Sequence, residues 1–117
     1  MNLDTAIQAH AEWKLKLRSA IQKKEPVDAA TISTDKACAL GKWLHGEAKA
    51  TYSGLASYAA CVDKHASFHR EAGKVATAIN AAKYAEADAM LASGTPYGAA
   101  SNAVGMAVLG LRKEAKL

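Results

Sequence analysis

The chain has 117 residues, of which 50% are hydrophobic and 22% are charged, and its formal net charge is +4. This length fits a single domain over residues 1–117, and no apolar run approaches the ~20 residues that span a bilayer. Abundant alanine, few β-branched residues and only two prolines, Pro26 and Pro96, favour an all-α fold.

The positive net charge does not indicate nucleic-acid binding. Lys and Arg are scattered among Asp and Glu, and no aromatic residue interleaves with the densest basic runs, Lys14–Arg18 and Lys23–Lys24. The first residues, Met1–Asp4, lack the basic segment that opens a secretory signal, so we expect a cytoplasmic protein without membrane insertion. In that reducing compartment, the two cysteines favour metal binding over a disulfide.

The first predicted helix covers Asp4–Lys24. Its apolar residues recur at steps of three and four, and His10 belongs to this stripe, so we expect His10 to face the core. Glu25–Pro26 ends the helix, because the residue before a proline disfavours helical backbone. A polar connection is expected over Asp28–Thr34. The stripe consists of Leu3, Ile7, His10, Leu17 and Ile21.

A short helix is predicted over Lys36–Leu44, with Thr34 or Asp35 as its N-cap. This places Cys38 in the first turn, where free backbone N–H groups and the positive end of the helix dipole favour a thiolate. Gly41 inside this helix costs about 1 kcal/mol relative to alanine. The close approach of a neighbouring backbone or ring would explain the glycine, and local irregularity is the alternative.

The third predicted helix, Gly54–Asn80, has the clearest pattern. His65 and His69 lie one turn apart within its apolar stripe, so their rings share one face of the helix. The stripe alternates steps of three and four through Leu55, Tyr58, Val62, His65, His69, Ala72, Ala76 and Ile79.

Two more helices follow, a short one over Tyr84–Leu91 and a last one that Thr95 and Pro96 open as N-cap and first helical residue. Together these elements predict an antiparallel four-helix bundle with a short extra helix that carries Cys38. The inner face of the last helix consists of Tyr97, Ser101, Val104, Val108 and Leu111. Its glycines, which suit close helix packing, are Gly98, Gly105 and Gly110.

Four side chains in these helices are good metal ligands. Burying His65 and His69 without partners is costly, and two histidines at i and i+4 are a common arrangement for a transition metal. His10 on another inner face and Cys38 at a helix start complete three imidazoles and one thiolate. This set suits tetrahedral zinc, although copper also binds it tightly. Di-iron is not favoured, because inward Glu-x-x-His pairs are missing.

Two other residues compete for ligand roles. Cys61 lies one turn before His65, but a ladder from Cys61 to His69 spans about 12 Å of helix axis, too far to surround one ion. Cys61 is therefore predicted to be a small core residue. His45, which precedes Gly46, is predicted to lie at a helix end or on the surface.

The spacing of these residues resembles the chemoreceptor zinc-binding (CZB) domain family over nearly the whole chain. The family pattern has a His followed by Trp-Lys, then Cys-x-Leu/Phe-Gly-x-Trp, then His-x-x-x-His. The resemblance implies a cytoplasmic bacterial regulatory domain that binds zinc. Family members are joined to chemoreceptor signalling domains or diguanylate cyclases, or stand alone, and are often homodimers. The matching residues are His10 with Trp13 and Lys14, Cys38 with Leu40, Gly41 and Trp43, and His65 with His69. The resemblance implies that four of them bind the zinc: His10, Cys38, His65 and His69.

Three functions are compatible with such a site. The first is a sensor of zinc or of oxidants such as hypochlorous acid, which acts through Cys38 and controls chemoreceptor signalling or diguanylate cyclase output. The second is a purely structural zinc site in a helical interaction module. The third, a zinc hydrolase, is not favoured, because four protein ligands close the position for water and Ala66 stands where zincins place a Glu. We therefore expect no catalytic residue and no enzymatic activity.

Overall fold

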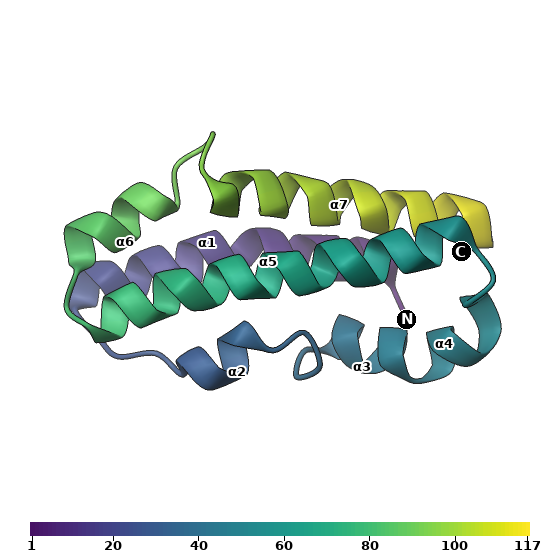
Figure 1. Cartoon of the computed structure of the whole chain (residues 1–117), viewed down its shortest axis with the longest axis horizontal. Coiled ribbons are helices and arrows are strands. Elements are labelled where there is room, and N and C mark those ends of the chain that lie inside the picture. The colour runs from purple at the N-terminus through teal and green to yellow at the C-terminus, as the bar shows by residue number, and fades with distance from the viewer.

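Three long helices form the body of the molecule: α1 (Leu3–Lys23), α5 (Ala56–Asn80) and α7 (Pro96–Ala115). They come from a computed structural model that describes residues 1–117. Figure 1 shows α1 and α5 running in the same direction, with α7 running the opposite way. An ion pair of 2.8 Å between Arg112 and Asp4 accordingly joins the end of α7 to the start of α1.

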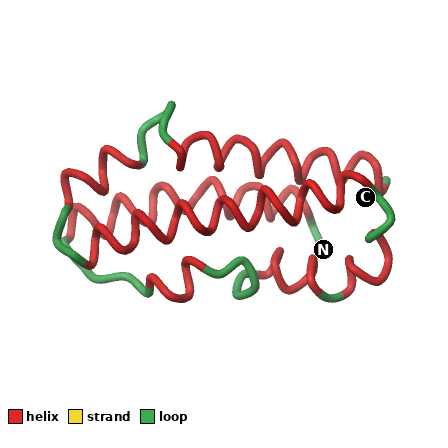
Figure 2. The backbone as a smooth tube through the Cα atoms, viewed as in Figure 1, coloured by secondary structure: helices red, strands yellow, loops and turns green.

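The fourth member of the bundle is a row of short helices. These are α2 (Ala29–Ser33), α3 (Ala39–His45) and α4 (Glu47–Tyr52), which carry the chain back from the end of α1 to the start of α5 (Figures 1 and 2). A further short helix, α6 (Tyr84–Met90), precedes α7. The predicted all-α bundle with a short helix at Cys38 is confirmed, and its fourth member is broken into pieces.

Two of the long helices, α1 and α7, begin where their capping residues predict. The Asn2 side chain accepts a hydrogen bond from the Thr5 N–H at the start of α1. Thr95 caps α7 in the same way, and Pro96 is its first residue. Such caps fix where a helix begins, because they satisfy N–H groups of the first turn that lack a partner within the helix. The first residues of α1 and α7 accordingly lie within one residue of the predicted positions.

The polar connection predicted over Asp28–Thr34 contains a short helix, α2, that was not predicted. Asp28 caps this helix by accepting hydrogen bonds from the backbone N–H and the hydroxyl of Thr31. A Cβ at Gly73 would lie 2.2 Å from the Ser33 hydroxyl, so the glycine allows α2 to lie directly on α5. Five residues are too few to show an apolar period, which explains why the sequence pattern missed this helix.

The prediction that the glycines of α7 pack against other helices holds only in part. A Cβ at Gly98 would lie 3.0 Å from the Ala92 carbonyl oxygen, so this glycine does permit a close approach. At Gly105 and Gly110, no atom lies within 4 Å of an added Cβ, and the space beside them is open. For these two positions the prediction is wrong.

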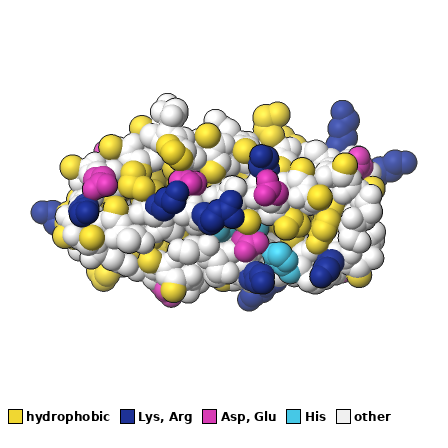
Figure 3. Space-filling view, in the orientation of Figure 1, with side chains coloured by type: hydrophobic (Ala, Val, Ile, Leu, Met, Phe, Trp, Pro, Cys, Tyr) yellow, Lys and Arg dark blue, Asp and Glu magenta, His cyan; other side chains and the backbone are white.

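The surface carries mixed charges and the helices are not suited to cross a membrane. Figure 3 shows Lys and Arg interspersed with Asp and Glu on the viewed face, without a single basic patch. None of the helices is both long enough and apolar enough for a transmembrane span.

Candidate metal centre

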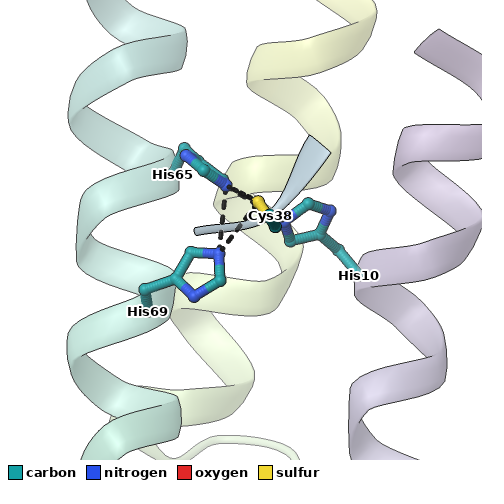
Figure 4. A group of neighbouring side chains, drawn as sticks. All are labelled: His10, Cys38, His65 and His69. Carbon is teal, nitrogen blue, oxygen red and sulfur yellow. Dashed lines mark hydrogen bonds between the residues drawn. The ribbon is translucent and has the colours of Figure 1, made fainter. Parts of the chain in front are cut away.

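Three elements of the fold bring His10, Cys38, His65 and His69 together. His10 lies on the inner face of α1, and His65 and His69 lie one turn apart on α5. Cys38 directly precedes α3. All three imidazoles are at most 5% exposed, and Cys38 is partly buried. Figure 4 shows the four side chains pointing toward one common point.

The distances between the ligand atoms fit a tetrahedral zinc ion. The Cys38 sulfur lies 3.2, 3.6 and 4.0 Å from the Nε2 atoms of His65, His69 and His10. The His65 Nε2 lies 3.1 Å from that of His10 and 3.0 Å from that of His69. Ordinary zinc–nitrogen and zinc–sulfur bonds at tetrahedral angles require about 3.3 Å between nitrogens and about 3.6 Å between nitrogen and sulfur. These five distances are close to the required ones, and all four ligand atoms lie within 4.8 Å of one another, so the cluster is close to the size of one zinc coordination sphere.

Backbone carbonyls fix two of the imidazoles in the orientation that a metal requires. The Nδ1–H of His10 donates to the Ala6 carbonyl oxygen at 2.7 Å, and that of His69 donates to the Ile32 carbonyl oxygen at 2.9 Å. With the proton held on Nδ1, each Nε2 presents its lone pair to the centre. Hydrogen bonds of this kind are typical partners of metal-ligating histidines.

Hydrogen bonds alone do not satisfy the three Nε2 atoms and the Cys38 sulfur at the centre. Because His10 and His69 carry their protons on Nδ1, only the Cys38 thiol and His65 can place a proton in the centre. The His65 Nδ1 is itself buried without a hydrogen-bond partner. Lone pairs facing one another at about 3 Å in a buried site are costly unless a cation lies between them. The donor set and its orientation thus fit a bound zinc ion.

Comparison with known protein families agrees with this geometry. Residues 10–76 match the family model described as the chemoreceptor zinc-binding domain. The chain belongs to the chemoreceptor zinc-binding domain family. The matched region includes His10, Cys38, His65 and His69, and it ends before α6 and α7. Searches of curated proteins and of solved structures gave no match.

Membership in this family confirms the predicted resemblance and zinc as the cofactor of the domain. The family is a regulatory one. The resemblance was expected over nearly the whole chain, whereas the match covers residues 10–76.

The environment of the zinc-binding domain's histidines keeps them in the neutral form that binds metals. Burial lowers the pKa of His10 and His69, and it lowers the pKa of His65 to about 3. At His65, the nearby His69 and His10 rings lower the pKa further, because two positive charges would lie close together.

These pKa values predict that the metal-free domain loses stability in acid. An unfolded histidine has a pKa near 6.5, so between pH 6.5 and about 3 the unfolded chain binds a proton that folded His65 does not. We expect the free energy of unfolding to fall as the pH drops through this window, by at most about 1.4 kcal/mol per pH unit for each histidine. Urea unfolding at several pH values measures this, and a His65→Gln variant should show a weaker dependence.

Cys38 is held differently from the histidines, because it is the N-cap of α3. The prediction that it lies in the first turn of that helix is therefore wrong. Its sulfur accepts a hydrogen bond of 3.4 Å from the Gly41 N–H. A Cβ at Gly41 would lie 1.6 Å from the Asp35 carbonyl oxygen. The predicted close backbone approach at Gly41 is therefore confirmed, and it comes from the turn that leads to Cys38.

The other two candidates lie outside the cluster. Cys61 is fully buried in the core, and burial raises its pKa to about 11. His45 lies at the end of α3, where its Nε2 is 2.9 Å from the Asp35 carboxylate. Burial alone would raise the pKa of Asp35, but the hydrogen bond from His45 holds it below its usual value. This contact joins the turn before Cys38 to the end of α3.

Phe68 is the neighbour of the centre that sequence reasoning missed. Its ring is fully buried and meets the rings of His10 and His69 edge-on, at centroid distances of 5.2 and 5.4 Å. It also contacts the Tyr97 ring of α7 at 5.6 Å. Phe68 lies between the turns of α5 that carry the histidines, and only the three-dimensional packing shows which rings it touches.

Proposed function

We propose that this domain is a bacterial regulatory sensor that binds zinc through His10, Cys38, His65 and His69. One observation carries the proposal: three buried imidazoles and one thiolate converge within 4.8 Å of one another. A closed set of four protein ligands is typical of zinc sites that do not catalyse hydrolysis.

The carriers of the four ligands differ in how firmly they are held. The three histidines lie on helices of 21 and 25 residues. Cys38 instead follows a turn and precedes a helix of seven residues. Segments with few helical hydrogen bonds open locally at lower cost. Cys38 is thus the ligand most easily released, and its release is the proposed signal.

An oxidant would act on the same atom. The Cys38 thiolate attacks the chlorine of hypochlorous acid and hydroxide leaves. Water then displaces chloride from the resulting sulfenyl chloride, so the sulfur ends as a sulfenic acid after a net two-electron oxidation. The sulfenic acid is a weaker zinc ligand than the thiolate, so the ion loses one of its four bonds. Zinc and oxidants would then be read by one site, in a domain that works in the cytoplasm.

The proposed partners are a second copy of the chain and a signalling output domain, either a chemoreceptor or a diguanylate cyclase, in cis or in trans. The support for them is the family, whose domains are found in signalling proteins. No nucleic acid and no membrane insertion form part of this proposal.

Oxidant titration of the purified domain tests the proposed role of Cys38. A Cys61→Ala variant retains Cys38 as its only thiol, and we expect it to release zinc in step with added hypochlorous acid, like the wild type. A Cys38→Ser variant should bind zinc at least about a hundredfold more weakly, since changes even around metal ligands cost 10–100-fold. A zinc-responsive dye and metal analysis measure both. Zinc that stays bound at oxidant doses that consume the Cys38 thiol would instead identify a purely structural site.

A further inference from the structure

The turn that leads to Cys38 has few bonds to the rest of the molecule. Figure 1 shows it as a loop between α2 and α3. Over residues 34–38, the only backbone–backbone hydrogen bond is the one that the Cys38 carbonyl oxygen accepts from the Lys42 N–H. The Lys36 N–H donates to the Thr34 hydroxyl, which lies within the same turn. Segments with so few hydrogen bonds open at low cost, so any contact that closes this turn has a large share in holding it.

One hydrogen bond joins this turn to another element. The Nε2 of His45, at the end of α3, lies 2.9 Å from the carboxylate of Asp35. Among residues 34–37, no other backbone or side-chain group makes a hydrogen bond or an ion pair outside the turn. The side chains of Asp35 and His45 are only 20% and 33% exposed, so water screens this pair less than it screens a pair on the open surface.

The α3 end of this contact is fixed to the bundle. The hydroxyl of Tyr58 on α5 donates a hydrogen bond of 2.5 Å to the carbonyl oxygen of Leu44. Leu44 directly precedes His45 and is fully buried. His45 is therefore attached to an anchored residue, whereas Asp35 lies on the loosely bonded turn. The Asp35 carbonyl oxygen also lies against Gly41, so the backbone and the side chain of Asp35 both face α3.

We propose that Asp35 and His45 form a latch that holds the turn before Cys38 against α3 and thereby sets how readily Cys38 leaves the zinc ion. The inference rests on the proposed function, in which the release of Cys38 is the signal. For the sulfur to move away from the ion, the turn has to leave α3, and the hydrogen bond between the two side chains has to break. Neither residue is a proposed ligand, so both are positioning residues.

The rate of zinc dissociation into an excess of a chelating dye tests the latch. His45→Phe keeps a ring but loses the N–H donor, and we expect zinc to leave about threefold to tenfold faster, as for the loss of one partly exposed hydrogen bond to a charged group. His45→Gln keeps an N–H donor and should release zinc at nearly the wild-type rate. Arg18→Gln is the matched control, because it removes an ion pair with Asp88 that involves neither the turn nor α3.

Alkylation of Cys38 by iodoacetamide gives a second readout, which needs no metal. In a Cys61→Ala background Cys38 is the only thiol, and we expect His45→Phe to speed its alkylation by a similar factor. Asp35→Ala should have the same effect, and the double variant should react no faster than either single one, because both changes break one contact.

Three results would overturn the latch: wild-type rates in His45→Phe and Asp35→Ala, equal acceleration by His45→Phe and His45→Gln, or additive effects in the double variant. A wild type that binds no zinc would contradict the proposed function instead. The alkylation rates of the metal-free proteins would then still decide whether the latch holds Cys38 in place.

Discussion

Replacing Gly41 with alanine is expected to weaken zinc binding about tenfold to a hundredfold, comparable to changes in residues that orient metal ligands. The added Cβ would lie 1.6 Å from the carbonyl oxygen of Asp35 and 2.7 Å from its carbon. These are backbone atoms, so no change of rotamer relieves the clash. The turn over residues 35–38 has to move away from α3, and Cys38 moves with it.

The measurement is zinc affinity by competition with a chelating dye, combined with thermal unfolding of the metal-free protein. We also expect a loss of about 1–3 kcal/mol in stability from the overpacking. Gly54→Ala is the matched control, because nothing lies within 4 Å of the added Cβ there. If the Gly41→Ala variant binds zinc as tightly as the wild type, the position of the turn over residues 35–38 does not determine the position of the Cys38 sulfur.

Removing the zinc ion is expected to lower the free energy of unfolding by about 4 kcal/mol. This value applies relative to a solution whose free zinc concentration is about a thousand times the dissociation constant. For a domain of this size that corresponds to a fall of roughly 15 °C in the midpoint of thermal unfolding. The physical reason is that the site exists only when α1, α5 and the segment before α3 are packed together, so the ion binds the folded chain alone.

Calorimetry with and without a chelator measures this effect. A His10→Ala variant, which removes the one proposed ligand on α1, should show a much smaller shift on addition of zinc. A midpoint that is the same with and without the ion would mean that the four side chains do not hold it in the folded state.

The long helices could be predicted from the sequence because each buries one continuous apolar stripe. Helix α5 shows this best, since its alternating steps of three and four extend from Leu55, just before its first residue, to Ile79, next to its last. The short helices α2 and α4 could not be predicted in this way. They contain five and six residues, and their positions depend on contacts with α5 and α3 rather than on their own periodicity.

The convergence at the metal centre was predictable for a related reason. His10, His65 and His69 stand at apolar positions of inward stripes, where an unpartnered imidazole is costly. The residues that orient them were not predictable, because Ala6 and Ile32 contribute backbone carbonyls that any residue type supplies. For Cys38, the sequence indicated the start of a helix but not that the cysteine itself caps it.

The four proposed ligands are also far apart along the chain, which affects the order of assembly. His10 and Cys38 are 28 residues apart, and His10 and His65 are 55 residues apart. A growing chain therefore emerges with one imidazole and one thiol long before the α5 histidines exist. Tight zinc capture has to wait until α5 is synthesised and docked beside α1. In a cell, zinc loading would thus mark newly made copies in which α5 has docked beside α1 and distinguish them from copies in which it has not.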